Sequence, residues 1–132
     1  MSFSRIIPHR ADGYVEAVFD GHEDWMSAVQ HIEQIVALFD EMDVYRVLMD
    51  FRRVDMRVAV VEAPDVARLF HKYAYHEMSF GIIPPVKARG MTTVERFAEC
   101  MERLGHTVQY LNAPAEIDAW TDMNAGTRRR AG

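Results

Sequence analysis

The feature of this sequence that most constrains its fold is an alternation of short apolar runs with longer amphipathic segments. Short apolar runs are typical of buried strands, and apolar residues that recur every three or four positions are typical of helices. The chain opens with two strand-like runs at residues 4–10 and 14–19, separated by an Asp12-Gly13 pair. This pair favours a tight turn because both residues tolerate a positive φ. We therefore predict an antiparallel hairpin, with Pro8 restricting the first strand to a sheet edge.

A long amphipathic helix is predicted next, over residues 21–42. Asp20 and Glu23 have the spacing of a capping box, which indicates where this helix starts. Its sheet-facing stripe is predicted to consist of Trp25, Val29, Ile32, Val36 and Phe39. The dense apolar run at 46–51 suits a central strand, and the charged residues 52–57 are expected to form a loop after it. A hairpin, a helix and a buried strand in this order form a right-handed crossover unit.

The second half of the chain repeats the same alternation. Pro64 suits the first turn of a second helix, and residues 80–83 form a short apolar strand. Thr92 and Glu95 have the spacing of another capping box, which predicts the start of a third helix. Gly105 is expected to end that helix in the left-handed conformation.

A last strand at 107–111 and a final helix that packs Ile117 and Trp120 complete the predicted order. Residues 58–61 fit either a short strand or the lead-in to the second helix, and the pattern leaves both open. The predicted fold class is α/β, with a mixed four- to five-stranded sheet and crossover helices in the order β-β-α-β-α-β-α-β-α.

The length of 132 residues is that of one domain, and we expect a single domain over 1–124 followed by a flexible basic tail at 125–132. The one cysteine, Cys100, cannot form an internal disulfide, which suits a reducing cytoplasm. No apolar run approaches the ~20 residues that a membrane span needs, and residues 1–10 lack the apolar stretch of a signal peptide. We therefore expect a cytoplasmic protein without a membrane span.

The charge of the chain disfavours nucleic acid as a partner. The formal net charge is −5, whereas nonspecific binding to phosphate backbones depends on many Lys and Arg side chains. The basic run at 128–130 is the one contrary feature, and no aromatic residue for base stacking is interleaved with it.

Three segments, together with the order of elements, carry a resemblance to a known fold family. They are Phe19-Asp20-Gly21, Val47-Leu48-Met49-Asp50-Phe51-Arg52-Arg53, and the closing Arg103-Leu104-Gly105-His106-Thr107-Val108-Gln109-Tyr110-Leu111 with Ala119-Trp120. In these features the chain resembles the STAS-like fold of anti-sigma-factor antagonists and of the cytoplasmic tails of sulfate transporters. More narrowly, it is similar to stand-alone bacterial proteins of uncharacterised function related to that fold. The resemblance implies a regulatory or protein-interaction module.

The sequence departs from the antagonists at the segment that regulates them. In that family a serine after the central strand is phosphorylated at a helix start, which blocks partner binding. The corresponding stretch here, residues 53–58, retains only Asp55 and has no hydroxyl residue beside it. The resemblance therefore does not extend to a phosphoserine switch of that kind, and whether any phosphorylation switch exists stays open.

Side chains with catalytic or metal-binding chemistry do not form a known motif. His71 and His76 are five residues apart, which separates them by about 140° around a helix. Cys100 adjoins an apolar helical stripe and is expected to serve as a small buried hydrophobe. Asp50 lies in an apolar strand, where a structural role as hydrogen-bond acceptor for the neighbouring loop is expected. We therefore expect no metal, no cofactor and no enzymatic activity.

The best candidate for binding is an anion site at the edge of the sheet. Arg52 and Arg53 follow the central strand, at the edge where open α/β sheets bind ligands. Lys87 and Arg89 precede the helix start expected at Thr92, where unpaired amides and the helix dipole favour an anion. If the two segments meet, they would bind one small anionic ligand or an acidic partner surface.

An apolar surface is the competing candidate. Aromatic and methionine residues crowd the second helix and the next strand, namely Phe70, Tyr73, Tyr75, Met78 and Phe80. An excess over what one face can bury would mark a homodimer patch or an apolar ligand groove. Two functions thus stay open: a non-catalytic interaction module with a protein partner, and a carrier or sensor of a small anionic or lipid-like ligand.

Overall fold

The computed structural model describes residues 3–131, with side chains described for residues 3–122. Its elements are β1 (Arg5–His9), β2 (Tyr14–Glu23), α1 (Trp25–Met42), β3 (Arg46–Met56), the short 3-10 helix η1 (Val60–Glu62), α2 (Ala63–Ala74), β4 (Ser79–Ile83), α3 (Ala88–Arg103), β5 (Thr107–Tyr110) and α4 (Pro114–Ala131). The five strands form one sheet in the order β1-β2-β3-β4-β5, with β1 and β2 antiparallel and the other pairs parallel. This confirms the predicted α/β class and its order of elements.

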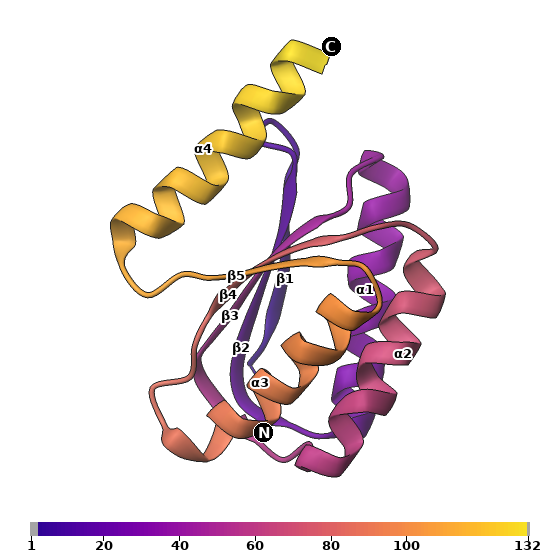
Figure 1. The fold of residues 1–132 in the computed structure, drawn as a ribbon, viewed down its shortest axis with the longest axis vertical. Helices are drawn as coiled ribbons and strands as arrows, with labels where there is room; N and C mark the ends of the chain where they lie inside the picture. The colour runs from indigo at the N-terminus through magenta and orange to yellow at the C-terminus, as the bar shows by residue number, and fades with distance from the viewer. Residues whose placement is uncertain (1–2, 132) are drawn as a thin grey trace.

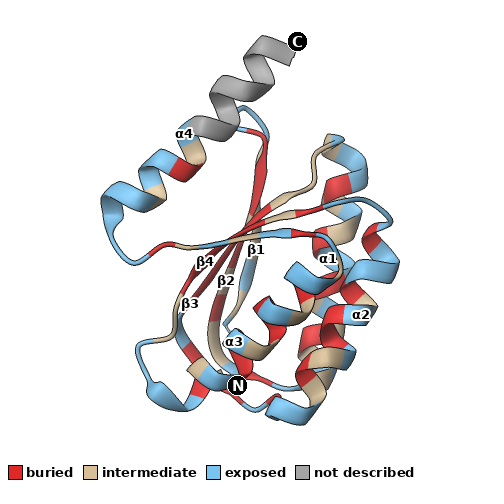
Figure 2. Cartoon of the chain, in the orientation of Figure 1, coloured by how far each residue is buried: buried red, intermediate tan, exposed pale blue. Residues whose placement is uncertain are grey.

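Two layers of helix cover the sheet unequally. Helices α1, α2 and α3 lie together on one face, whereas α4 lies alone on the other and extends beyond the strands (Figure 1). The red inner sides of α1, α2 and α3 in Figure 2 mark the main core against that face. A second, smaller core on the other face consists of Tyr14, Leu48, Ile83, Leu111 and Trp120. The four parallel strands end at a common edge, which we name the carboxyl edge, and the helices that follow them start there.

Residues 52–56 of the charged segment form strand, not the predicted loop, and Arg57 follows the strand. β3 runs to Met56 and pairs with an equally extended β2, which runs to Glu23. Between the pairs Val18–Asp50 and Asp20–Arg53, β3 advances three residues while β2 advances two, which is a β-bulge in β3. The extra residue leaves Arg52 and Arg53 exposed and returns Val54 and Met56 to the core. The charges therefore occupy outward positions of a strand.

Both predicted capping boxes are wrong, and for the same reason. Asp20 lies within β2, and α1 is capped instead by Asp24, whose carboxylate accepts from the Ser27 amide at 2.9 Å. The helix α3 starts four residues before the predicted position, with Lys87 as its N-cap, so Thr92 lies inside the helix. A capping-box spacing between two polar residues is common by chance, and strand pairing and packing decide where each helix begins.

The other local predictions have mixed outcomes. Residues 58–61 are a lead-in to α2, with Val60 and Val61 in η1. Gly105 has φ 97° directly after α3, which confirms the predicted left-handed terminator. Cys100 is half-buried against the main core. The side chains of residues 123–132 lie outside the described part of the chain, so the flexible basic tail at 125–132 stays a prediction.

The inner stripe of α1 is rotated from the predicted one. Its buried residues are Ala28, Ile32, Ile35 and Phe39. Trp25, expected within the stripe, is only half-buried at the first turn. No helix among the described residues is long and apolar enough to cross a membrane.

Candidate functional site

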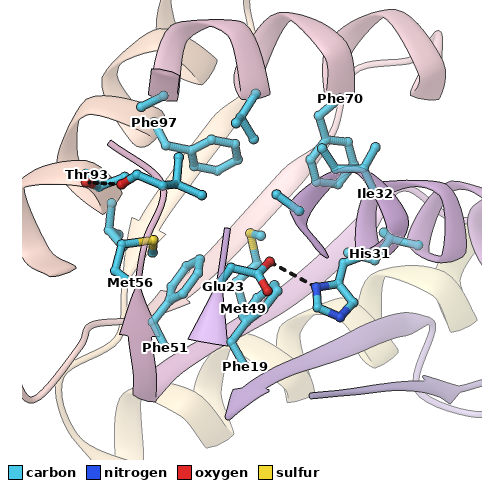
Figure 3. A pocket seen from close by; sticks show the side chains of 16 residues that line it. Phe19, Glu23, His31, Ile32, Met49, Phe51, Met56, Phe70, Thr93 and Phe97 are labelled. Atoms are coloured by element: carbon cyan, nitrogen blue, oxygen red, sulfur yellow. Dashed lines mark hydrogen bonds and ion pairs between the residues drawn. The ribbon is translucent and has the colours of Figure 1, made fainter. Parts of the chain in front are cut away.

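A cavity of about 50 Å³ lies inside the main core, between the sheet and the three helices (Figure 3). It is lined by Phe19, Glu23, Ala28, His31, Ile32, Ile35, Met49, Phe51, Met56, Val58, Ala63, Val66, Phe70, Thr93, Val94 and Phe97. These residues come from β2 and β3, from the segment after β3, and from the inner sides of α1, α2 and α3, and Glu23, Met56, Ala28 and Ala63 lie where the strands end and the helices begin. The cavity is therefore close to the carboxyl edge. At about 24 cal/mol per Å³, an empty space of this size costs about 1 kcal/mol of stability.

One carboxylate lies in this otherwise apolar wall. Glu23 is only 4% exposed. His31 Nδ1 lies 2.9 Å from its Oε2, and the Ser27 hydroxyl donates to its Oε1 at 3.0 Å. Figure 3 shows the Glu23 carboxylate between the aromatic walls, with its ion pair to His31. Burial of a carboxylate is costly unless it is paired and hydrogen-bonded, and these two contacts meet that need.

The alternation of side chains between the two faces of β2 explains why Glu23 faces inward. Val15, Ala17 and Phe19 point into the main core, and Glu23 falls in the same phase four residues after Phe19. The sequence interpretation missed this residue because it assigned Glu23 to a capping box. Continuing the two-residue period of β2 past Asp20 would have placed the carboxylate inside.

The hydroxyl of Thr93 is a further polar group of the cavity wall, beside Glu23 and His31. It donates to the Val58 carbonyl at 3.1 Å and so joins α3 to the segment after β3. Thr93 is buried, whereas its neighbour Thr92 is exposed on the outer side of the helix. The hydrogen-bonding capacity that the cavity offers an occupant is therefore concentrated at Glu23 and His31.

A second hollow, of about 240 Å³, opens on the other face of the sheet at the carboxyl edge. It is lined by Arg52, Ile83, Pro84, Pro85, Val86, Leu111, Asn112, Ala113, Pro114 and Ile117. The loop after β4 and the first turn of α4 form its walls, and Arg52 is its only charged lining residue. Its shape and lining suit a small molecule with an apolar body and an anionic group.

The Arg52 guanidinium is held in place by Asp50. Its Nε donates to Asp50 Oδ1 at 3.0 Å and its Nη2 donates to Oδ2 at 2.8 Å. The Asp50 carboxylate also accepts from the Arg52 backbone amide at 3.1 Å. These hydrogen bonds and the Asp50 charge raise the pKa of Arg52. Asp50 is thus a structural acceptor as expected, although its partner is a strand residue and not a loop.

The arginines of the predicted anion site lie near three different carboxylates, with Arg52 paired to Asp50. Arg53 lies 4.0 Å from the Asp20 carboxylate, on the β2 side of β3. Arg89 is close enough to another carboxylate, that of Asp55, to contribute to lowering its pKa, after the larger effect of hydrogen bonds from Arg57. Lys87 is exposed at the start of α3.

The backbone amides that the sequence analysis expected to bind an anion, at a helix start at Thr92, do not lie at a helix start. Thr92 is inside α3, where its backbone amide is part of the helix. Of the five predicted residues, Arg52 alone lines a hollow that is described here.

Two of the histidines, His71 and His106, contact each other. The Met78 amide donates to His106 Nδ1 at 2.9 Å, and His106 Nε2 lies 2.8 Å from His71 Nδ1. His106 is buried, and desolvation together with His71 lowers its pKa. No group of three or more potential metal ligands occurs among the described residues.

The apolar region proposed around α2 and β4 is mostly core. Phe70, Met78 and Phe80 are fully buried, so these three side chains add no exposed apolar surface there. Tyr73 and Tyr75 remain exposed, at the opposite end of α2 from the carboxyl edge.

Exposed apolar residues gather at the carboxyl edge instead. Seven large apolar side chains are exposed in the described part of the chain, and five of them are at this edge, namely Phe3, Met26, Val60, Val61 and Val86. The last four precede or begin the helices that follow β2, β3 and β4. Phe3 reaches the same edge because its amide donates to the Asp20 carbonyl at 2.8 Å. Single exposed apolar residues are ordinary, but five of the seven described here lie at one edge, which makes this edge a candidate contact surface.

Comparison with known proteins identifies the fold. No protein-family model and no curated protein matches the sequence. Among solved structures, the chain is similar to an uncharacterized protein from the DUF3478 family with a SpoIIAA-like fold from Shewanella loihica PV-4. The TM-score is 0.59 and the identity 13%, over 91% of this chain and 93% of that chain. The chain therefore has a SpoIIAA-like, or STAS-like, fold, which confirms the resemblance inferred from its sequence.

Proposed function

We propose that this chain is a non-catalytic regulatory module that binds a protein partner through its carboxyl edge. The observation that carries the proposal is the concentration of exposed apolar side chains at that edge. Val61 and Val86 are 84% and 80% exposed, so contact with a partner would remove nearly all of their surface from water. The SpoIIAA-like fold adds support by analogy with the anti-sigma-factor antagonists that the sequence resembles, since a fold by itself does not determine function.

Introduction of charge at the apolar edge tests this function. We expect the double variant Val61→Asp/Val86→Asp to lose the partners that the parent protein retains from a lysate of the source organism, because a charge opposes burial of the surface. Tyr75→Asp is the matched control, since Tyr75 is 87% exposed at the opposite end of α2. Quantitative mass spectrometry of the bound proteins measures the difference. Equal recovery with the double variant and the parent would contradict docking at the carboxyl edge.

A second candidate function is the carrier or sensor of a small anionic ligand, and the hollow beside Arg52 favours it. Asp50 occupies two donors of the guanidinium, and a guanidinium has five, so others remain for an anion. The prolines and Ile83 would contact an apolar body while Arg52 pairs with a carboxylate.

Benzoate is a suitable probe of this hollow because it combines an aromatic ring with one carboxylate. We expect benzoate to bind the parent protein in a calorimetric titration and to bind Arg52→Gln about tenfold more weakly, since a charge-assisted hydrogen bond is lost. Arg53→Gln serves as the control, because Arg53 is the next residue of β3 and does not line the hollow. Unchanged affinity in Arg52→Gln would exclude the hollow as the anion site.

A further inference from the structure

The strand β5 is the last of the sheet and has one free edge. Its only strand neighbour in the described part of the chain is β4, to which it is parallel. The Thr107 and Leu111 amides both donate to carbonyls on the β4 side, at 3.0 Å and 2.8 Å. Alternate residues of a parallel strand bond to the same neighbour, so the amides and carbonyls of Val108 and Tyr110 point away from β4. These four backbone groups are available to a further strand.

The two edges of the sheet differ in their protection against such a strand. β1, at the opposite edge, begins with the charged Arg5 and contains Pro8, which has no amide to donate. β5 consists of Thr107-Val108-Gln109-Tyr110, with no charged residue, no proline and no shift in its register with β4. Its β-branched and aromatic residues favour strand pairing. The edge of β5 therefore lacks the features that prevent addition of a strand from another chain.

Three glutamates of α3 lie beside this edge. Glu95, Glu99 and Glu102 are exposed and recur at spacings of four and three, so they form one row along the helix. The row is close to β5, because burial raises the pKa of Tyr110 most and the three carboxylates raise it further. Carboxylate oxygens of Glu99 lie 3.4 and 3.8 Å from two arginine side chains of α3, whereas Glu95 and Glu102 form no ion pair among the described residues. The row therefore keeps a net negative charge.

We propose that the free edge of β5 binds an extended segment of a partner protein as an added strand, and that this segment carries basic side chains at alternate positions. Its backbone would form hydrogen bonds with Val108 and Tyr110. Alternate side chains of a strand lie on one face about 7 Å apart, so one set would extend toward the glutamate row of α3. The other set would lie beside Thr107 and Gln109, which are exposed and uncharged. This surface is separate from the carboxyl edge, so the inference does not depend on the function proposed above.

Amide NMR of the parent protein with a short peptide tests the proposal. The probe is Lys-Val-Lys-Val-Lys, acetylated and amidated at its ends. We expect it to shift the amide signals of Val108 and Tyr110 saturably, because these amides would gain hydrogen bonds. Absence of saturable shifts at these two residues would overturn the proposal.

Two matched peptides separate the backbone contacts from the charge. Glu-Val-Glu-Val-Glu has the opposite charge, and the lysine peptide N-methylated at every residue keeps its charge but lacks internal backbone donors. We expect each to bind at least about tenfold more weakly than the probe. Equal binding of the glutamate peptide would exclude a basic partner, and equal binding of the N-methylated peptide would exclude an added strand, so either result overturns the proposal.

The same spectra distinguish a peptide from a second copy of this chain. Antiparallel pairing of two β5 edges would place both α3 helices on the same face, where their glutamate rows would approach each other. We therefore expect the signals of Val108 and Tyr110 to be independent of protein concentration in the absence of peptide. Shifts with protein concentration alone would overturn the proposal, because another copy would then occupy the edge.

Two double variants test the contribution of the glutamate row. Glu95→Lys/Glu102→Lys is expected to weaken binding of the probe about tenfold, because attraction becomes repulsion. Glu33→Lys/Asp40→Lys is the matched control, since it changes the net charge equally at two exposed positions that are also seven residues apart. These positions lie on α1, which contacts β1 and β2 on the other side of the sheet. Equal binding of the probe to the two variants would overturn the proposal, and the three peptides decide the matter on the parent protein if either variant does not fold.

Discussion

Replacement of Trp120 by alanine is expected to lower the free energy of unfolding by about 3–5 kcal/mol. Trp120 is 3% exposed and is the largest side chain of the small core between α4 and the sheet. Its ring meets the Tyr14 ring edge-on at a centroid distance of 5.7 Å, and the Arg46 guanidinium lies 4.2 Å from its ring centroid. Loss of the indole removes these contacts together, and α4 alone covers this face, so no neighbouring helix can close the space.

Trp25→Ala is the comparison for this prediction, and we expect it to lower the free energy of unfolding clearly less than Trp120→Ala does. The sequence pattern predicted the opposite order, because Trp25 falls in the apolar stripe of the longest predicted helix. In the structure Trp25 is half-buried at the first turn of α1, and alanine at that position leaves less apolar surface unburied. Urea unfolding of the parent and of the two variants measures both losses in the free energy of unfolding. A larger loss for Trp25→Ala than for Trp120→Ala would contradict the packing described here.

Gly81 shows how closely the indole fits the sheet. A Cβ atom at this position would lie 2.9 Å from Trp120 Cε2 and 3.0 Å from Leu111 Cδ1. The glycine therefore gives the Trp120 ring direct access to the backbone of β4. The contact between Gly81 and Trp120 could not be predicted from the sequence, since the two residues are 39 positions apart and belong to different elements.

Features that depend on nearby residues could be predicted from the sequence. The Asp12-Gly13 hairpin and the left-handed Gly105 each follow from the backbone freedom of one or two residues. The order of strands and helices follows from the periodicity of apolar residues. These local signals were sufficient for the fold class, because a chain with this order of elements has few ways to form a mixed sheet.

Features that depend on a distant partner could not be predicted. Residues 52–57 are rich in charge and look like a loop, yet β2 pairs with residues 53–56 and the bulge turns Val54 and Met56 inward. Glu23 is buried only because α1 presents Ser27 and His31 to it. The candidate cavity was therefore missed, whereas Arg52 was placed correctly at the carboxyl edge because it directly follows a recognisable strand.

Acidification is expected to destabilise this protein through His106, which the sequence alone does not distinguish from the other histidines. The Met78 amide donates to Nδ1, so neutral His106 carries its hydrogen on Nε2 and donates it to His71. A proton added to this pair must break one of the two hydrogen bonds, and burial further disfavours the charge. Glu77 is the nearby group that acts in the opposite direction.

The sign of the pH effect follows from the lowered pKa of folded His106. In the unfolded chain His106 takes up its proton near pH 6.5, whereas the folded protein resists protonation until a lower pH. The stabilising contribution is therefore complete above about pH 6.5 and is lost as the pH falls through the pKa of the folded state, with a slope of at most about 1.4 kcal/mol per pH unit. Urea unfolding between pH 5 and pH 8 measures this dependence.

His106→Phe isolates the contribution of this residue from that of other titrating groups. Phenylalanine keeps the aromatic volume beside Phe80 but cannot accept from the buried Met78 amide, so we expect a loss of about 1–3 kcal/mol at pH 8. Below pH 6.5 the difference between parent and variant should shrink, because only the parent continues to lose stability through His106. His9→Phe is the control, since His9 lies on β1, is more exposed, and pairs with Glu16 outside the core. A difference between parent and His106→Phe that stays constant from pH 8 to pH 5 would show that His106 titrates alike in the folded and unfolded states, against the geometry of its two hydrogen bonds.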